Sequence, residues 1–293
     1  MTFSKTSAAL AQWLKDLSEG KTEVSYSGGT FGESLVLAPG RITVIGAPPG
    51  AGKTALATQA AFEALDRLPE LTLHIANAEM EIEQLLTREL ARRSRVSAAK
   101  MNKGRDELTS EEFEALILAY EGLVPAIKRT RHMVPPFSCE ELGELSLVDP
   151  GILIVDYLQK FRSAASDTRA GVDEVMTCLR ELALQGWAVL ALSATTRSNG
   201  KKGGHDPEGL SLSSFKESGE IEFNADAAYV LRNKSDSHAD VKDIDLDCVK
   251  NRAGPLTLLE LRFSGELMRF ERNEPEIYEE FKEYAQGSEA EQW

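Results

Sequence analysis

The residues best suited to chemistry lie in one glycine-rich loop, between an apolar β-branched run at 41–45 and a helical pattern at 54–65. Backbone N–H groups freed by its glycines can wrap a β-phosphate, and the helix N-terminus adds a partial positive charge. Lys53 can reach the β- and γ-phosphates, and the Thr54 hydroxyl can bind Mg²⁺. The loop therefore predicts ATP and Mg²⁺ as cofactors. Its residues are Ala47, Pro48, Pro49, Gly50, Ala51, Gly52, Lys53 and Thr54.

Two acidic residues are candidates to complete such a site. Asp156 follows the apolar run 152–155, and we expect it to support the Mg²⁺ shell. Taken alone, an Asp in this position is more often a helix cap or a turn residue, but the phosphate loop favours the metal role. Glu79, just after the run 71–76, can orient the attacking water. It equally suits a first-turn glutamate stabilised by the helix dipole, so from the residues alone both interpretations stay open.

Strands and helices alternate around these residues. Apolar strand patterns cover 41–45, 71–76, 151–155, 187–193 and 227–231. Helical patterns cover 54–65, 81–93, 109–120 and 172–184, the third opened by a capping-box pair, Thr109 and Glu112. This order predicts an α/β fold with a mostly parallel central sheet and helices on both faces. From 244 onward the pattern predicts two strands joined by a Gly-Pro turn, which would form a C-terminal antiparallel hairpin.

Composition excludes several classes of protein. The 293 residues include 33 Lys and Arg against 47 Asp and Glu, a net charge of −14. A uniformly basic coat for nucleic acid is therefore excluded, whereas a local basic site is not. Three widely spaced cysteines and four histidines form no disulfide framework or metal pattern, which favours a reducing cytoplasm. No signal peptide and no stretch long enough to cross a bilayer are evident, so we expect a cytoplasmic protein without a membrane partner.

Three segments are expected along the chain: an N-terminal helix and linker at 1–24, an ATPase domain at 25–270 and an acidic tail at 271–293. An amphipathic helix at 4–20 places four apolar residues on one face, namely Leu10, Trp13, Leu14 and Leu17. This face can pack on its own domain or dock on another subunit, and both alternatives stay open. For the tail, solvated disorder is favoured over DNA mimicry or partner binding.

Five stretches, in this order, resemble the motor domain of DnaB-type replicative helicases, which has a RecA-like fold. They are APPGAGKT (47–54), NAEM (77–80), ILIVDYLQ (152–159), ESGEIEFNAD (217–226) and KNRAGP (250–255). The resemblance implies that Glu79 is the catalytic glutamate and Asp156 the Walker B aspartate. It also implies that Lys250 and Arg252 belong to a trans-acting element, with Arg252 as an arginine finger for a neighbouring subunit. From the residues alone, these two cations would be solvated hairpin residues.

The resemblance further implies contacts with single-stranded DNA from loops that face the channel of a ring. One stretch matches the family's DNA-contacting segment, and its residues are Lys216, Glu217 and Gly219. Two other loops are candidates by composition, with Arg162 and Arg169 in one and Lys201 and Lys202 in the other. Ordinary surface charge explains these four equally well. Because aromatic residues for base stacking are missing there, we expect contacts with the DNA backbone that are largely independent of sequence.

Two departures from the family pattern bear on function. Ala194 stands where the family usually has a Gln that senses the γ-phosphate, so the coupling of hydrolysis to movement is in question. Only about 25 residues precede the motor, where replicative members carry a collar domain that meets the primase. This second departure favours a bacteriophage, plasmid or mobile-element replication protein.

The function expected from these observations is Mg²⁺-dependent ATP hydrolysis by a ring or helical oligomer, most simply a hexamer. It would act as a helicase or translocase on single-stranded DNA, with a replication or loader protein as a further partner. The alternative is a nucleotide-switched RecA-like ATPase that scaffolds or signals without unwinding, and the net charge and Ala194 favour it. A small-molecule kinase is a weaker third interpretation, because the C-terminal hairpin with Arg252 suits an assembly better.

Overall fold

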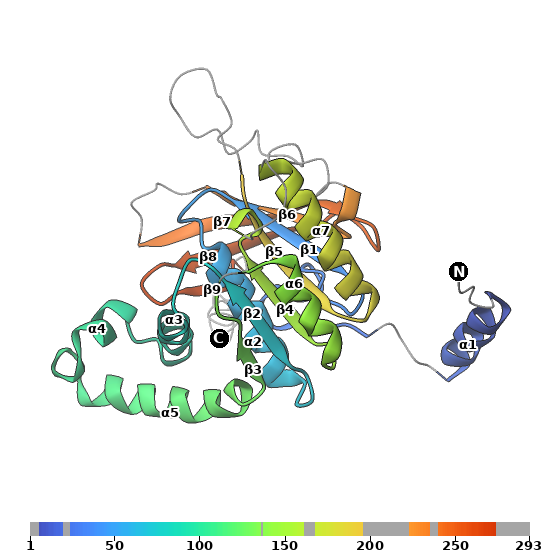
Figure 1. Ribbon diagram of the computed structural model, residues 1–293. Coiled ribbons are helices and arrows are strands. Elements are labelled where there is room, and N and C mark those ends of the chain that lie inside the picture. The colour runs from blue at the N-terminus through green and yellow to red at the C-terminus, as the bar shows by residue number, and fades with distance from the viewer. Residues whose placement is uncertain are drawn as a thin grey trace, which may run out of the picture.

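The computed structural model describes residues 6–19, 24–135, 137–160, 168–195, 223–234 and 240–273. Within them, a nine-stranded sheet has the order β3-β2-β4-β5-β1-β6-β7-β8-β9 (Figure 1). The strands are β1 (Ile42–Ala47), β2 (Leu73–Asn77), β3 (Thr130–His132), β4 (Ile152–Asp156), β5 (Ala188–Ala194), β6 (Ala227–Asn233), β7 (Val241–Asn251), β8 (Leu258–Ser264) and β9 (Arg269–Arg272). The helices are α1 (Thr6–Ser18), α2 (Lys53–Arg67), α3 (Ile82–Ser94), α4 (Ala98–Lys103), α5 (Ser110–Ile127), α6 (Cys139–Gly143) and α7 (Thr168–Leu184).

The strands from β3 to β6 are parallel to one another, and β7, β8 and β9 continue the sheet in antiparallel fashion. This confirms the predicted α/β fold and the C-terminal hairpin, to which β9 adds a further strand. β1 lies between β5 and β6, so the loop after β1 opens at the centre of the sheet. Since the carboxyl ends of parallel strands meet at one edge, residues that follow β1, β2 and β4 converge there.

The inner strands are buried on both faces, as their continuous apolar runs predict. Ile45, Ile75 and Ile154 belong to the core on one face, where α2 packs with ten buried residues between Ala55 and Leu65. Val44 and Leu153 belong to the core on the opposite face, under α6 and α7. A parallel sheet between two helical layers holds its carboxyl edge rigid, which suits a site that needs fixed geometry.

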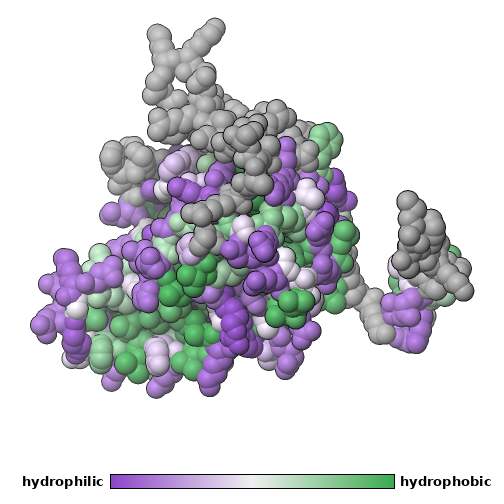
Figure 2. Space-filling model, viewed as in Figure 1, coloured by the Kyte–Doolittle hydropathy of each residue, from purple (hydrophilic) through white to green (hydrophobic). Residues whose placement is uncertain are grey.

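The helices α3, α4 and α5 form an extension beside the β2–β3 end of the sheet (Figure 1). Both halves of the predicted capping box are present: Thr109 Oγ1 accepts from the Glu112 N–H at 3.2 Å, and Glu112 Oε2 accepts from the Thr109 N–H at 3.0 Å. α5 runs to Ile127, beyond the predicted end at Tyr120, yet among its own residues only Leu123 and Ala126 are buried. Apolar side chains are therefore visible on this extension (Figure 2), and the exposed ones on α5 are Phe113, Ile117, Leu118 and Tyr120.

α1 stands apart from the sheet and its covering helices (Figure 1). Its apolar face is exposed, with Leu10 and Trp13 each 58% accessible and Leu17 61% accessible. Of the two alternatives for this face, packing on its own domain is therefore not what the structure shows. None of the helices in the described ranges is long and apolar enough to span a membrane.

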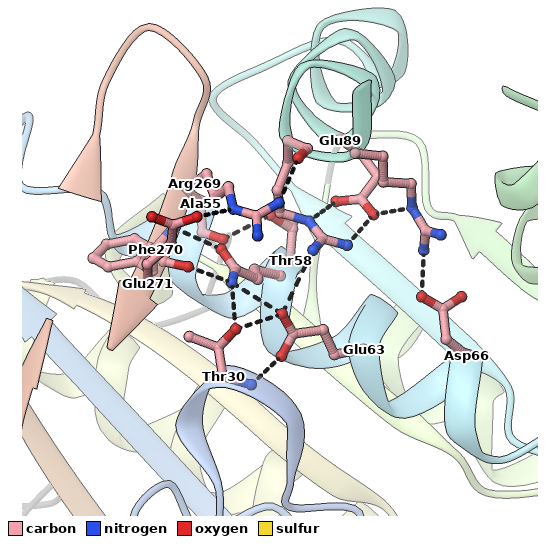
Figure 3. Close-up of polar contacts among 12 residues, drawn as sticks. Thr30, Ala55, Thr58, Glu63, Asp66, Glu89, Arg269, Phe270 and Glu271 are labelled. Atoms are coloured by element: carbon pink, nitrogen blue, oxygen red, sulfur yellow. Dashed lines mark hydrogen bonds and ion pairs between the residues drawn. The ribbon is translucent and has the colours of Figure 1, made fainter. Parts of the chain in front are cut away.

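A group of charged residues, which we call the α2–α3 ion cluster, has a buried centre at Glu89 and Arg92 and joins the two helices that begin at the predicted site (Figure 3). Its members are Glu63 and Asp66 of α2 and Glu89, Arg92 and Arg93 of α3. Arg92 binds Glu89 in bidentate fashion, with N–O distances of 2.8 and 2.6 Å, and lies 3.5 Å from Glu63. Arg93 donates to Glu89 at 2.6 Å and to Asp66 at 2.7 Å. The cluster therefore fixes α3 against α2.

Candidate nucleotide-binding site

The loop from Ala47 to Thr54 joins the central strand β1 to α2, as expected. Gly52 precedes the first residue of α2 with φ +90°, a left-handed conformation that favours glycine. A Cβ atom there would also lie 2.9 Å from the Phe270 ring and 3.3 Å from the Phe263 ring. Gly50 has φ +76° with open space around it. The two glycines therefore shape the loop for different reasons, one by conformation alone and the other by conformation and close packing.

Lys53 places its ammonium inside this loop. Its Nζ donates to the carbonyl oxygen of Ala47 at 2.9 Å and to that of Pro48 at 3.3 Å. Burial lowers the pKa of Lys53, while the negative charges of Asp156 and Glu79 oppose that change. A cation held by neutral carbonyl groups in a partly desolvated loop is suited to exchange those weak acceptors for a phosphate.

Asp156 lies at the end of β4, opposite the start of α2. Its Oδ2 accepts from the Thr54 hydroxyl at 2.6 Å, and its Oδ1 is buried with no hydrogen-bond partner among the residues that the structure describes. Burial raises the pKa of Asp156 to about 6, and the Glu79 charge adds to this rise against the opposing effects of Thr54 and Lys53. A carboxylate and a hydroxyl at this distance, with one carboxylate oxygen unpartnered, fit the hard oxygen ligands that Mg²⁺ prefers.

Glu79 lies two residues beyond β2, which is hydrogen-bonded to β4 with Asn77 opposite Asp156. The structure thus brings four predicted residues, Lys53, Thr54, Glu79 and Asp156, to one edge of the sheet. A cavity of about 760 Å³ lies there, lined by Lys53, Thr54 and Glu79 as well as by Pro49 and Gly50.

The same cavity has lining residues that sequence reasoning missed. They are Arg88 of α3, Tyr157 and Lys160 after β4, Lys242 of β7, and Phe263, Gly265 and Met268 around the β8–β9 turn. Arg88 is one of several arginines on α3, and no pattern distinguishes it from Arg92 or Arg93. Lys242 follows Lys53 by almost two hundred residues, so only the fold brings them together. The cavity therefore has cations on several sides, as a polyphosphate site requires.

Ala194, at the end of β5, also lines the cavity. The neighbouring polar side chain is Gln159, which donates to Ser193 Oγ at 3.0 Å and accepts from the Ala194 N–H at 3.5 Å. An amide group therefore lies next to Ala194, where the family pattern has its Gln, but it comes from the residues after β4 and not from β5.

Lys250 and Arg252 do not line the cavity of their own chain. Lys250 lies opposite Ala228, next to an irregularity in the β6–β7 pairing. Arg252 is half-exposed and 3.5 Å from the Asp226 carboxylate, and it also donates to the Phe223 carbonyl. The structure thus places both cations at the end of the β6–β7 ladder, apart from the residues at the phosphate loop.

Six candidates for DNA contact lie outside the described residues, namely Arg162, Lys201, Lys202, Lys216, Glu217 and Gly219. Arg169 lies in the first turn of α7, and only its backbone is described.

The central phosphate loop, the acidic end of β4 and the parallel sheet extended by an antiparallel hairpin define a RecA-like P-loop ATPase domain. The chain belongs to the DnaB-like helicase C-terminal domain family, whose model matches residues 35–272. This confirms the family expected from the five sequence stretches.

Individual relatives agree with this assignment. The replicative DNA helicase DnaB of Haemophilus influenzae is 28% identical over 254 residues, which cover 80% of this chain and 52% of that protein. A probable plasmid replicative DNA helicase of Chlamydia trachomatis is 24% identical over 250 residues, which cover 81% and 52%. The chain thus spans about half the length of these curated relatives.

Solved structures show the same fold. The ATPase domain of G40P superposes with a TM-score of 0.79 at 20% identity, covering 93% of this chain and all of that one. A DnaB-like replicative helicase, described together with its interactions with primase, gives a TM-score of 0.76 at 19% identity and covers 93% and 68%.

Proposed function

We propose that this chain hydrolyses ATP and drives a DnaB-like helicase or translocase along single-stranded DNA. The observation that carries the proposal is the 2.6 Å contact between Thr54 and Asp156 beside a cavity that Lys53 and Glu79 also line. Membership of the helicase family favours this function over a nucleotide-switched scaffold. The likeness to a plasmid replicative helicase supports a role in plasmid, bacteriophage or mobile-element replication.

The proposed roles follow from the chemistry of each group. Lys53 binds the β- and γ-phosphates, and Glu79 orients the attacking water. Thr54 and Asp156 would hold Mg²⁺, which when bound would supply neutralisation of charge on the transferring phosphoryl group. Positioning and electrostatics account for most of the catalysis in reactions of this kind, so a rigid sheet edge suits it.

We further propose that the active form is a ring or helical oligomer, most simply a hexamer. Lys250 and Arg252 act on the nucleotide of a neighbouring subunit. Their placement away from their own cavity supports this, as do the exposed apolar faces of α1 and α5. Burying such faces against a second copy stabilises association by removing apolar surface from water.

The remaining expectations belong to the same proposal. Residues 25–270 form the ATPase domain, flanked by the segments 1–24 and 271–293. Single-stranded DNA binds at the seven residues that the sequence offers as DNA contacts. A replication or loader protein is the further partner, and the protein acts in the cytoplasm.

Measuring phosphate release with Mg²⁺ and ATP, with and without a single-stranded oligonucleotide, tests this function. We expect single-stranded DNA to stimulate hydrolysis. High salt should suppress this stimulation, because protein contacts with DNA phosphates release counterions and weaken as the salt concentration rises. Lys53→Ala should abolish turnover, whereas Lys216→Ala should remove only the stimulation by DNA. A rate that is unchanged by DNA would favour the scaffold, and an absence of hydrolysis would exclude the proposed function.

A further inference from the structure

Asn77, the last residue of β2, makes three side-chain hydrogen bonds to groups at the site. Its side chain is 2% accessible. Its Nδ2 donates to Asp156 Oδ2 at 3.0 Å. Its Oδ1 accepts from the backbone N–H groups of Glu79 at 2.8 Å and of Met80 at 2.9 Å. One buried amide therefore joins the carboxylate proposed to hold Mg²⁺ to the turn that carries the glutamate proposed to orient water.

These three contacts fix the orientation of the amide. If it were rotated by 180°, the NH₂ group would face two N–H donors and the carbonyl oxygen would face a carboxylate, so all three hydrogen bonds would be lost. An ionised aspartate in this place can accept but cannot donate, and alanine can do neither. The position thus calls for a group that is a donor on one side and an acceptor on the other.

The donation from Asn77 also selects which oxygen of Asp156 remains available. Oδ2 receives both the Thr54 hydroxyl and the Asn77 amide, at 2.6 and 3.0 Å. Oδ1 is left buried and without a partner among the described residues. Backbone pairing cannot do this: the Ala78 N–H donates to the Asp156 carbonyl at 2.8 Å, which holds the strand ends together but leaves the carboxylate free to rotate.

We propose that Asn77 is a positioning residue that sets the Asp156 carboxylate and the Glu79 turn in one arrangement. The inference rests on the proposed ATP hydrolysis. Because the reacting groups must be held within fractions of an ångström, loss of this link lowers turnover more than it lowers nucleotide binding, which depends on Lys53 and the loop.

The first test uses the nucleotide-free chain and needs no activity. Amide hydrogen exchange is measured at Glu79 and Met80 in the wild type, Asn77→Ala and Asn77→Asp. We expect at least about tenfold faster exchange at both amides in Asn77→Ala, because their acceptor is gone. Asn77→Asp keeps an acceptor and should retain most of the protection. Equal exchange in the wild type and Asn77→Ala would overturn the inference.

The second test compares turnover with binding. For Asn77→Ala and Asn77→Asp we expect kcat to fall by about 100-fold, the size of effect that a small misplacement of reacting groups produces. The Kd for a non-hydrolysable ATP analogue should stay within about threefold of the wild-type value. Asn77→Asp separates the two halves of the link, since it keeps the acceptor for the turn but loses the donor to Asp156.

Thr43→Val is the matched control. Thr43 is also buried in a central strand, near the start of β1, and its hydroxyl donates to the Val36 carbonyl at 2.6 Å, but it does not line the cavity. We expect it to lower Tm and leave kcat unchanged. The inference fails if Asn77→Ala keeps wild-type kcat, or if it loses analogue binding as strongly as turnover. A wild-type chain without ATP hydrolysis would instead remove the proposed function, and the inference with it.

Discussion

At the scale of single residues, Gly52 has the tightest surroundings in the phosphate loop. Gly52→Ala must adopt φ +90° and place a Cβ 2.9 Å from the Phe270 ring. Gly50→Ala must adopt φ +76° in open space. The left-handed conformation alone costs about 1–2 kcal/mol, so Gly50→Ala should lose that much unfolding free energy. Gly52→Ala should lose clearly more, because Phe270 is fully buried and cannot move away.

Urea unfolding of the two variants beside the wild type measures this difference. If both substitutions lower the free energy of unfolding by the same amount, the packing of Phe270 does not explain the glycine at position 52.

The raised pKa of Asp156 predicts how the stability of the nucleotide-free chain depends on pH. A carboxyl whose pKa is about 6 in the folded state, against 3.8 for the ordinary group, binds more protons when folded. Its contribution to stability is therefore present below about pH 4 and is lost as the pH rises to about 6, by roughly 3 kcal/mol. Asp156→Asn should remove this dependence.

The measurement is the free energy of unfolding between pH 4 and 7 for the wild type and Asp156→Asn. The difference between them isolates Asp156 from His74, whose pKa burial lowers and whose effect has the opposite sign. A difference that does not change with pH would contradict the assigned cause.

Some residues of the site stand in local sequence patterns and could be predicted from the sequence, whereas others reach the site only through the fold. Lys53, Thr54 and Asp156 could be predicted because each stands in a recognisable local pattern. The first two open a helix after a glycine-rich loop, and Asp156 ends an apolar strand. Asn77 and Arg88 could not be predicted, because their contacts depend on the β2–β4 register and on the face of α3 that meets the cavity. Lys242 and Met268 reach it only because the antiparallel strands fold back over the loop.

At the scale of elements, the α2–α3 ion cluster predicts a large effect for one arginine. Arg92→Met leaves Glu89, which is 2% accessible, with one fewer cation and brings no new hydrogen bond. Leaving a buried charge wholly uncompensated costs about 3–5 kcal/mol. Arg93 still donates to Glu89 at 2.6 Å, so we expect a loss near the lower end of that range. Arg95→Met is the matched control: its pair with Glu271 is largely exposed and should contribute less than about 1 kcal/mol.

Thermal unfolding of the two variants distinguishes these values. Similar Tm values for Arg92→Met and Arg95→Met would show that the cluster does not fix α3 against α2.

Which elements could be predicted follows the same logic. Long apolar runs, such as β4 and β5, and capped helices, such as α5, carry their own pattern. β3 and β9 were missed because they are short and mostly polar, and each forms by pairing with a strand already in place. The α2–α3 ion cluster was missed because charged residues at helical spacing usually lie on a solvated face.

At the scale of the whole molecule, the proposed trans-acting role of Arg252 means that one chain completes the site of another. An interface is active only when one subunit supplies Lys53 and its neighbour supplies Arg252. A chain with Lys53→Ala and a chain with Arg252→Ala should each be inactive alone, since each lacks one half at every interface. In an equal mixture that assembles at random, about a quarter of the interfaces contain both an intact Lys53 and an intact Arg252.

Phosphate release from mixtures of these two chains is therefore the most direct measurement. In the control mixture, Arg262→Ala replaces Arg252→Ala. This substitution removes an exposed cation of β8 that lies 3.9 Å from Asp243. The Arg262→Ala chain should already be active alone. We expect a mixture of Lys53→Ala and Arg252→Ala to give hydrolysis above the sum of the separate chains, with a maximum near equal amounts. Hydrolysis by Arg252→Ala alone at the wild-type rate, or no gain at any ratio, would contradict the action of Arg252 on a neighbouring subunit.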